Sequence, residues 1–144
     1  MIDHIKPNLN KSNKVSNTLN DLHNKDAKEN LIKKLWVLDR LRGHNFMTWK
    51  ILDRAVKIWK QEESTNPEIL VKYFSPGMTW YITEIDIKNE WLAFWYVFDE
   101  FYREWELWYV NLEELSLIKN RLWLPIERDK FFDERAHLND IIKK

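Results

Sequence analysis

The sequence contains no cysteine and only two glycines, and both scarcities exclude kinds of site. A chain without cysteine forms neither disulfides nor thiolate metal sites. Gly43 and Gly77 alone cannot supply a glycine-rich phosphate loop or a dinucleotide-binding fingerprint. No apolar run approaches the roughly 18 residues of a membrane span, and the polar residues 1–14 do not resemble a secretory signal. We therefore expect a cytoplasmic protein with no membrane contact.

Charge is balanced in total but uneven along the chain. The 23 Lys and Arg side chains equal the 23 Asp and Glu side chains in number. Residues 1–68 carry 13 cations and 9 anions, whereas residues 69–144 carry 10 cations and 14 anions. Nine of these acids lie between Glu84 and Glu114, against two cations. A surface built from that segment would repel phosphate and attract a basic protein.

The first half of the sequence predicts two helices. Apolar residues recur at helical spacing over residues 26–43 and 45–63. Asp26 and Asn45 are typical of helix N-caps, and Gly43 is typical of a helix end. Residues 1–25 are polar, and we expect them to form a flexible segment ahead of a single domain, residues 26–144.

The second half predicts an α+β fold with a four-stranded antiparallel meander. Runs of β-branched and aromatic residues are separated by breaks too short for crossover helices. The expected strands are residues 69–74, 78–86, 91–98 and 104–110. The third is apolar on both faces, which favours a central position covered on both sides. We then expect a short helix, an extended segment and a C-terminal helix, over residues 112–119, 121–126 and 131–144.

Several short motifs occur in the order typical of one known family. They are Pro76, Thr79–Tyr81, Thr83–Glu84, Leu112, Glu114–Leu115 and Leu124–Asp129, the last reading Leu-Pro-Ile-Glu-Arg-Asp. On these residues the chain resembles the domain-of-unknown-function family twenty-nine fifty-eight, over roughly residues 70–132. The resemblance implies a protein of bacterial plasmids, integrative elements or phage, without an established activity. Where the family usually has glycines before the last motif, this chain has Asn120 and Trp123.

Acidic and aromatic residues of the predicted sheet form the first candidate site. They are Glu84, Glu100, Glu104, Glu106 and Trp108. Tryptophan concentrates binding energy in protein interfaces, and carboxylates attract a basic surface. We expect these residues to bind a basic protein partner, as in an inhibitor whose carboxylates replace the phosphates bound by a host nucleic-acid-handling or defence protein. Aromatic residues on strands more often belong to a hydrophobic core, which is the simpler interpretation.

Basic residues of the second predicted helix form an alternative site. Lys50, Arg54 and Lys57 suit a nucleic-acid-binding accessory protein that contacts phosphates. A merely solvated helix face is the simpler interpretation, because acids such as Asp53 dilute the charge. Arg42 is expected on the same solvent-facing side.

Glu127, Arg128 and Asp129 are the third candidate. In an extended segment Glu127 and Asp129 would share one face, as an acid–base pair in an enzyme requires. The structural alternative has Arg128 bridging carboxylates and Asp129 capping the last helix. The four histidines have no metal-ligand spacing, so we expect neither a metal nor a cofactor. Protein binding, nucleic-acid binding and catalysis all stay open, as does the oligomeric state.

Overall fold

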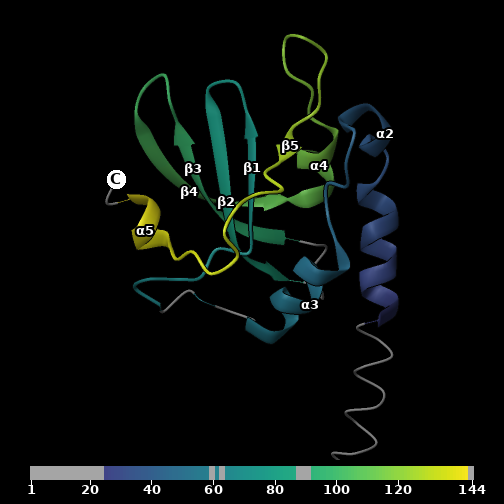
Figure 1. Ribbon diagram of the computed structural model, residues 1–144, viewed down its shortest axis with the longest axis horizontal. Helices are drawn as coiled ribbons and strands as arrows, with labels where there is room; N and C mark the ends of the chain where they lie inside the picture. Colours follow the sequence, from purple (N-terminus) through teal and green to yellow (C-terminus); the bar gives the residue numbers. More distant parts are fainter. Residues whose placement is uncertain (1–24, 59–60, 62–63, 87–91, 143–144) are drawn as a thin grey trace, which may run out of the picture.

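The computed structural model describes residues 25–58, 61, 64–86 and 92–142. These residues form helices and a five-stranded antiparallel sheet with strand order β4-β3-β2-β1-β5 (Figure 1). The predicted α+β class is therefore confirmed, with one strand more than the sequence predicts. The predicted flexible segment lies outside the described residues, except for Lys25.

Four strands follow one another as the predicted meander, and a fifth joins from far along the chain. The four are β1 (Val71–Ser75), β2 (Met78–Asp86), β3 (Leu92–Asp99) and β4 (Glu104–Asn111). The fifth strand, β5 (Glu127–Arg128), pairs antiparallel with β1. A segment of two residues is too short to show strand periodicity, so the sequence pattern could not reveal β5.

A β-bulge in β2 changes which side chains reach the core. The pairing register between β2 and β3 shifts between Ile82 and Glu84. A bulge reverses the alternation of side chains beyond it. Strict alternation would place Ile85 on the face opposite Trp80 and Ile82. Because of the bulge, Ile85 instead joins both of them in the core. On β3 the expected cover on both sides is wrong, because Phe94 is only half-buried.

The first predicted helix is broken into two. Residues 25–35 are helical and residues 36–38 form a turn, before α2 (Asp39–Arg42) ends at Gly43 with φ +85°. The second helix, α3 (Trp49–Ile58), begins later than predicted. Its cap is the hydroxyl of Thr48, which accepts the N–H of Ile51 at 3.2 Å, so the prediction of Asn45 as the cap is wrong.

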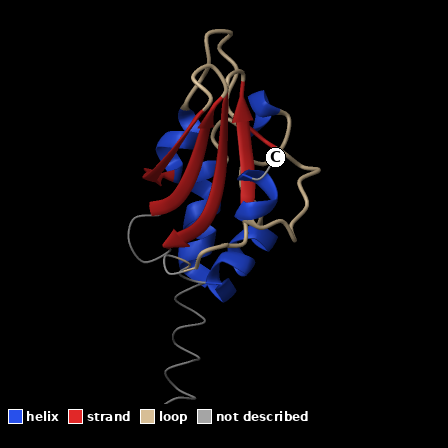
Figure 2. Cartoon of the chain, turned by 90° about the vertical axis from the view of Figure 1, so that its left-hand side faces the viewer, coloured by secondary structure: helices blue, strands red, loops and turns tan. Residues whose placement is uncertain are grey.

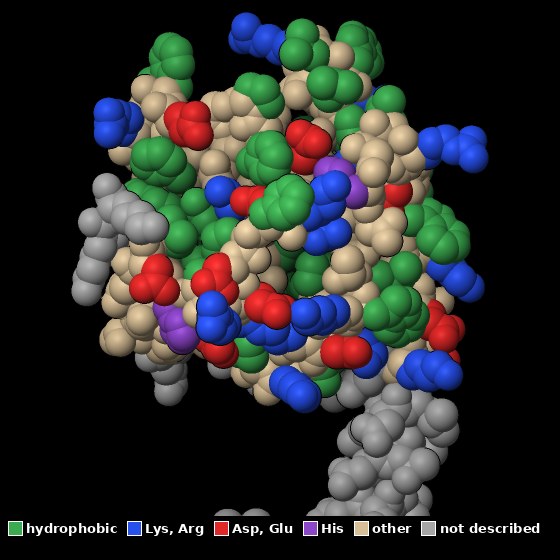
Figure 3. Space-filling view, viewed as in Figure 1, with side chains coloured by type: hydrophobic (Ala, Val, Ile, Leu, Met, Phe, Trp, Pro, Cys, Tyr) green, Lys and Arg blue, Asp and Glu red, His purple; other side chains and the backbone are tan. Residues whose placement is uncertain are grey.

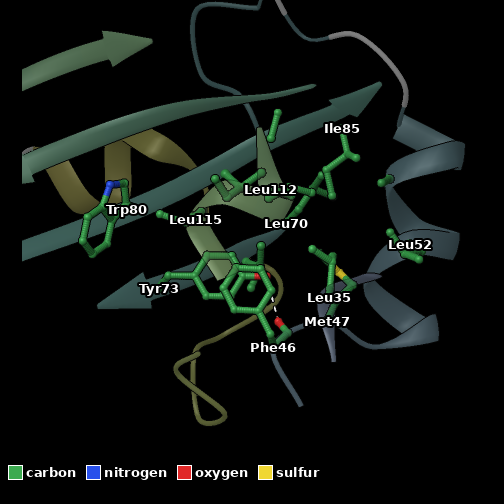
Figure 4. Close-up of a cluster of buried hydrophobic side chains, with 14 of the residues drawn as sticks. Leu35, Phe46, Met47, Leu52, Leu70, Tyr73, Trp80, Ile85, Leu112 and Leu115 are labelled. Carbon is green, nitrogen blue, oxygen red and sulfur yellow. Dashed lines mark hydrogen bonds between the residues drawn. The ribbon is translucent and has the colours of Figure 1, made fainter. Parts of the chain in front are cut away.

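Buried residues between the two helices explain this delay. Phe46 and Met47 are 0% and 3% exposed, and they pack into the core that Figure 4 shows. The rings of Phe46 and Tyr73 stack with centroids 4.1 Å apart. The Tyr73 hydroxyl donates to the Phe46 carbonyl at 2.8 Å, and burial raises the pKa of Tyr73. The chain here inserts into the core instead of starting a helix.

The helices lie on both sides of the sheet. In Figure 2, α5 (Leu138–Ile142) lies in front of the strands and the N-terminal helices lie behind them. On the α5 side, Phe132 contacts Tyr81 with ring centroids 6.1 Å apart. Asn111 caps α4 (Leu112–Leu117), because its side chain accepts two backbone N–H groups of this helix. The predicted C-terminal helix is shorter than expected, because α5 starts only at Leu138.

Arg42 is buried, contrary to the prediction that it faces solvent. Its guanidinium donates to the carbonyls of Ile126 at 2.5 Å and Ser116 at 2.9 Å, and to the Asp39 carboxylate at 2.6 Å. It also lies over the Phe46 ring, 4.7 Å from the centroid. Arg42 thus ties α2 to the end of α4 and to the segment that leads into β5.

Candidate functional site

The edge strand β4 exposes the largest run of side chains on the sheet. Leu107, Trp108 and Tyr109 are 54%, 63% and 55% exposed. Glu104 and Glu106 are exposed beside them. We call these five residues the β4 surface. An apolar edge strand is a template on which another chain can pair or pack.

The strand pairing brings three of the predicted binding residues onto one face. Glu104, Glu106 and Trp108 alternate along β4, so their side chains project from the same side of the sheet. No Lys or Arg among the described residues forms an ion pair with Glu104 or Glu106. Both carboxylates are therefore available to a basic partner.

The turn between β3 and β4 adds exposed aromatic rings that the sequence reasoning missed. Phe101 and Tyr102 are 86% and 71% exposed, and the predicted contact Glu100 is exposed next to them. The Asp99 carboxylate fixes the turn by accepting the N–H groups of Phe101 at 2.8 Å and Tyr102 at 3.1 Å. The sequence did contain a signal for these exposed rings, because two adjacent aromatic residues stand in a turn that was predicted to be polar.

Glu84 does not belong to this surface. Only 8% of it is exposed, and its carboxylate accepts the Gln61 N–H at 2.7 Å. Gln61 in turn donates to the carbonyls of Glu68 and Thr83. Glu84 follows the β2 bulge, so it holds the segment after α3 onto the sheet. Its predicted role as a protein contact is wrong, because a buried carboxylate cannot reach a partner.

A second surface is a cleft of about 660 Å³ between α3 and the segment that follows β5. Two predicted nucleic-acid contacts, Lys50 and Arg54, line it, together with Arg128 and Asp129 of the Leu-Pro-Ile-Glu-Arg-Asp motif. The structure therefore joins two candidate sites that are more than 70 residues apart in sequence. The third predicted contact, Lys57, is exposed but does not line the cleft.

The predicted catalytic pair is not brought together. β5 ends at Arg128, so the alternation that would align Glu127 with Asp129 stops there. Glu127 lines a separate groove of about 170 Å³, whereas Asp129 lines the larger cleft. The Asp129 carboxylate lies 3.5 Å from Lys72 and accepts the N–H of Phe131 at 3.0 Å. It fixes a turn, and it does not cap the last helix.

Arg128 is held by backbone contacts and not by a carboxylate. Its Nε donates to the Asn45 carbonyl at 2.8 Å, and no ion pair with an acid forms among the described residues. Its backbone N–H donates to Nε2 of His44 at 3.0 Å. Burial, and next the charge of Arg128, lower the pKa of His44, and this direction favours the neutral ring that can accept the bond.

A family described as a protein of unknown function, DUF2958, matches residues 47–144. The chain belongs to this family. This confirms the resemblance seen in the sequence motifs and extends it beyond residues 70–132. No curated protein and no solved structure matches the chain.

The DUF2958 match covers both candidate surfaces. It begins at Met47 and so includes α3, all five strands, the cleft and the β4 surface. Residues 25–46, with the first helix, α2 and the buried Arg42, precede it. The two surfaces are therefore built on the part of this chain that the family shares.

The loop before the last motif is where this DUF2958 chain departs from the expected glycines. Trp123 has φ +62°, a left-handed conformation that favours glycine, and its side chain is 76% exposed. The predicted extended segment is wrong here, because the Trp123 N–H donates to the Asn120 carbonyl in a turn. Figure 1 shows this loop projecting between α4 and β5.

The described part of this DUF2958 chain has no helix with the length and apolar character needed to cross a bilayer. Within the same residues, no three His, Asp or Glu side chains lie close enough to hold a metal ion.

Proposed function

We propose that this chain is a non-catalytic binding protein that engages a basic protein partner through the β4 surface. The observation that carries the proposal is the exposure of Leu107 and Trp108 on an edge strand of eight residues. A sheet edge of this length exposes backbone donors and acceptors that a partner strand can satisfy. Tryptophan at such an edge supplies a large contact area with few rotatable bonds.

Charge on the β4 surface favours a basic partner. Glu104 and Glu106 share one face of β4 with Trp108, and Glu100 lies in the adjoining turn. Unpaired carboxylates steer a positively charged protein toward the strand, and they repel nucleic acid. The same arrangement makes self-association a weaker fit, since each copy brings its own acids to the contact.

A narrower form of the proposal concerns the partner's own function. A protein that binds nucleic acid has a basic surface, and carboxylates can occupy the positions of its phosphates. In this form the chain is an accessory protein of a mobile genetic element or phage, and it inhibits a host nucleic-acid-handling or defence protein. The exposed carboxylates and the family motifs support this form of the proposal. It predicts that the partner's nucleic acid and this chain compete for the same basic surface of the partner.

The test compares capture of partners by the tagged wild-type protein and by a variant, Glu100→Lys, Glu104→Lys and Glu106→Lys together. Lysates are treated with nuclease, and the captured protein is then purified for kinetic measurements. We expect the variant to lower the association rate constant at least about tenfold at low salt, and to weaken its salt dependence. Trp108→Ala should raise the dissociation rate constant, because interface mutations at aromatic anchors act mainly on dissociation.

A matched control carries the same charge change away from β4. Asp26→Lys, Glu29→Lys and Glu114→Lys together alter three acids on other elements. We expect this control to bind as the wild type does. Reversal of Lys50, Arg54 and Lys57 should also leave protein capture unchanged. Protein capture that the basic reversal abolishes and the acidic reversal spares would contradict the proposal.

A further inference from the structure

We propose that the cleft between α3 and the segment after β5 binds a nucleotide unit, with its phosphate on Arg128 and Lys130 and its base on the apolar lining. The cleft volume of about 660 Å³ lies within the range of small-molecule sites, roughly 300–1,000 Å³. In Figure 3, basic and acidic side chains gather over this part of the molecule. This site is independent of the β4 surface, because the two share no residue.

The cleft has a surplus of positive charge. Its cations are Lys50, Arg54, Lys72, Arg128, Lys130 and Arg135, and its acids are Asp129, Asp133 and Glu134. Each of the three acids already pairs with a cation of the cleft. The pairs are Glu134 with Lys50 at 3.0 Å, Asp129 with Lys72 at 3.5 Å and Asp133 with Arg135 at 3.3 Å. The acids therefore leave the other three cations of the cleft unneutralised.

Of those three cations, Arg54 is already engaged, because it pairs with Glu68 at 3.7 Å and donates to the Ile69 carbonyl. Arg128 and Lys130 have no acid partner among the described residues that a phosphate would have to displace. Arg128 uses Nε for the Asn45 carbonyl, and its two terminal nitrogens bond to no group among the described residues. Lys130 forms no ion pair there either. A guanidinium with both terminal nitrogens open presents a fork that matches two phosphate oxygens.

The apolar lining selects a nucleotide over a simple anion. Ile51, Leu70, Val71 and Phe132 line the cleft next to the charged groups. Leu70 and Val71 are almost fully buried, so they form its floor, and the Phe132 ring is half-buried beside them. A flat base can pack on such side chains while its phosphate reaches the cations. Inorganic phosphate would leave this lining unused, and an acidic peptide would place carboxylates against it.

The experiment is isothermal titration of the full-length protein with five probes. They are adenosine 5′-monophosphate, adenosine, inorganic phosphate, a twelve-nucleotide oligodeoxyadenylate and hexaglutamate. We expect the monophosphate or the oligonucleotide to bind more tightly than the other three. Tighter binding of the monophosphate would identify the ligand as a free nucleotide. Tighter, steeply salt-dependent binding of the oligonucleotide would identify it as a nucleotide within a single strand.

Two variants locate the binding. The double variant Arg128→Gln with Lys130→Gln should lower the affinity for the tighter-binding probe at least about tenfold, equivalent to about 1.4 kcal/mol. Lys130→Glu alone should weaken binding of that probe several-fold. Among the described residues Lys130 forms no ion pair whose loss would disturb the fold. The control, Lys33→Gln with Lys34→Gln, removes two exposed lysines from the first helix, outside the cleft. It should change the affinity less than about twofold.

Four results would overturn the proposal. They are the absence of binding by both nucleotide probes, equal affinity for inorganic phosphate, tighter binding of hexaglutamate, and an equal loss in the control variant. The second would mean a general anion site and the third a site for acidic protein. Circular dichroism of each variant shows whether it is folded. If the Arg128 variant is unfolded, Lys130→Glu alone decides.

Discussion

Replacement of Arg42 by methionine should destabilise this protein more than a change at any exposed arginine. The guanidinium holds two carbonyls, those of Ile126 and Ser116, and the Asp39 carboxylate. Methionine has a similar length, so the variant removes the charge and the donors while it keeps most of the packing. The two carbonyls would then lie in the interior without a donor, since the Arg42 side chain itself is 0% exposed.

The expected loss follows from the balance of these contacts. Breaking a buried ion pair on one side costs about 3–5 kcal/mol, mainly through the partner left behind. Asp39 moderates this, because its side chain is 16% exposed and still accepts the Phe46 N–H at 2.9 Å. We therefore expect about 3 kcal/mol, near the low end of that range. For a domain with a total stability of about 5–15 kcal/mol, this is a large fraction.

Urea denaturation followed by tryptophan fluorescence measures this loss, since the chain has nine tryptophans. Arg40→Met is the matched control, because Arg40 lies on the same helix and is exposed. We expect it to change the free energy of unfolding by less than about 0.5 kcal/mol. A loss below about 1 kcal/mol for Arg42→Met, or an equal loss in the control, would refute the reasoning about buried donors.

Two further predictions concern pH and the projecting loop. Because the folded-state pKa of His44 is lowered, its stabilising contribution is present above the unfolded value of about 6.5 and is lost as the pH falls through the folded pKa. The free energy of unfolding should drop between pH 7.5 and 5.5, with a smaller drop in His44→Gln; equal drops would exclude His44 as the cause. At Trp123, with φ +62°, glycine should give a protein more stable than alanine by about 1 kcal/mol in urea denaturation, since alanine keeps the left-handed strain. A more stable alanine variant would contradict this assignment of strain.

The sequence alone determined the elements that depend on local pattern. The meander from β1 to β4 follows from alternating apolar runs and short polar breaks. The helix end at Gly43 and the cap at Asn111 follow from residue types with strong local preferences. The family resemblance also came from sequence, because the motif at Leu124–Asp129 is specific. In each case the cause lies within a few residues of its effect.

The tertiary structure alone decided how distant residues combine. Glu84 and Arg42 look like surface charges in sequence, yet a bulge in β2 and the contacts of α2 bury them. β5 exists only because β1 offers it an edge, and that pairing brings Arg128 to the same cleft as Lys50 and Arg54. Periodicity reports which residues share a face of one element. It carries no information about which faces meet, because that depends on packing the whole chain around one core.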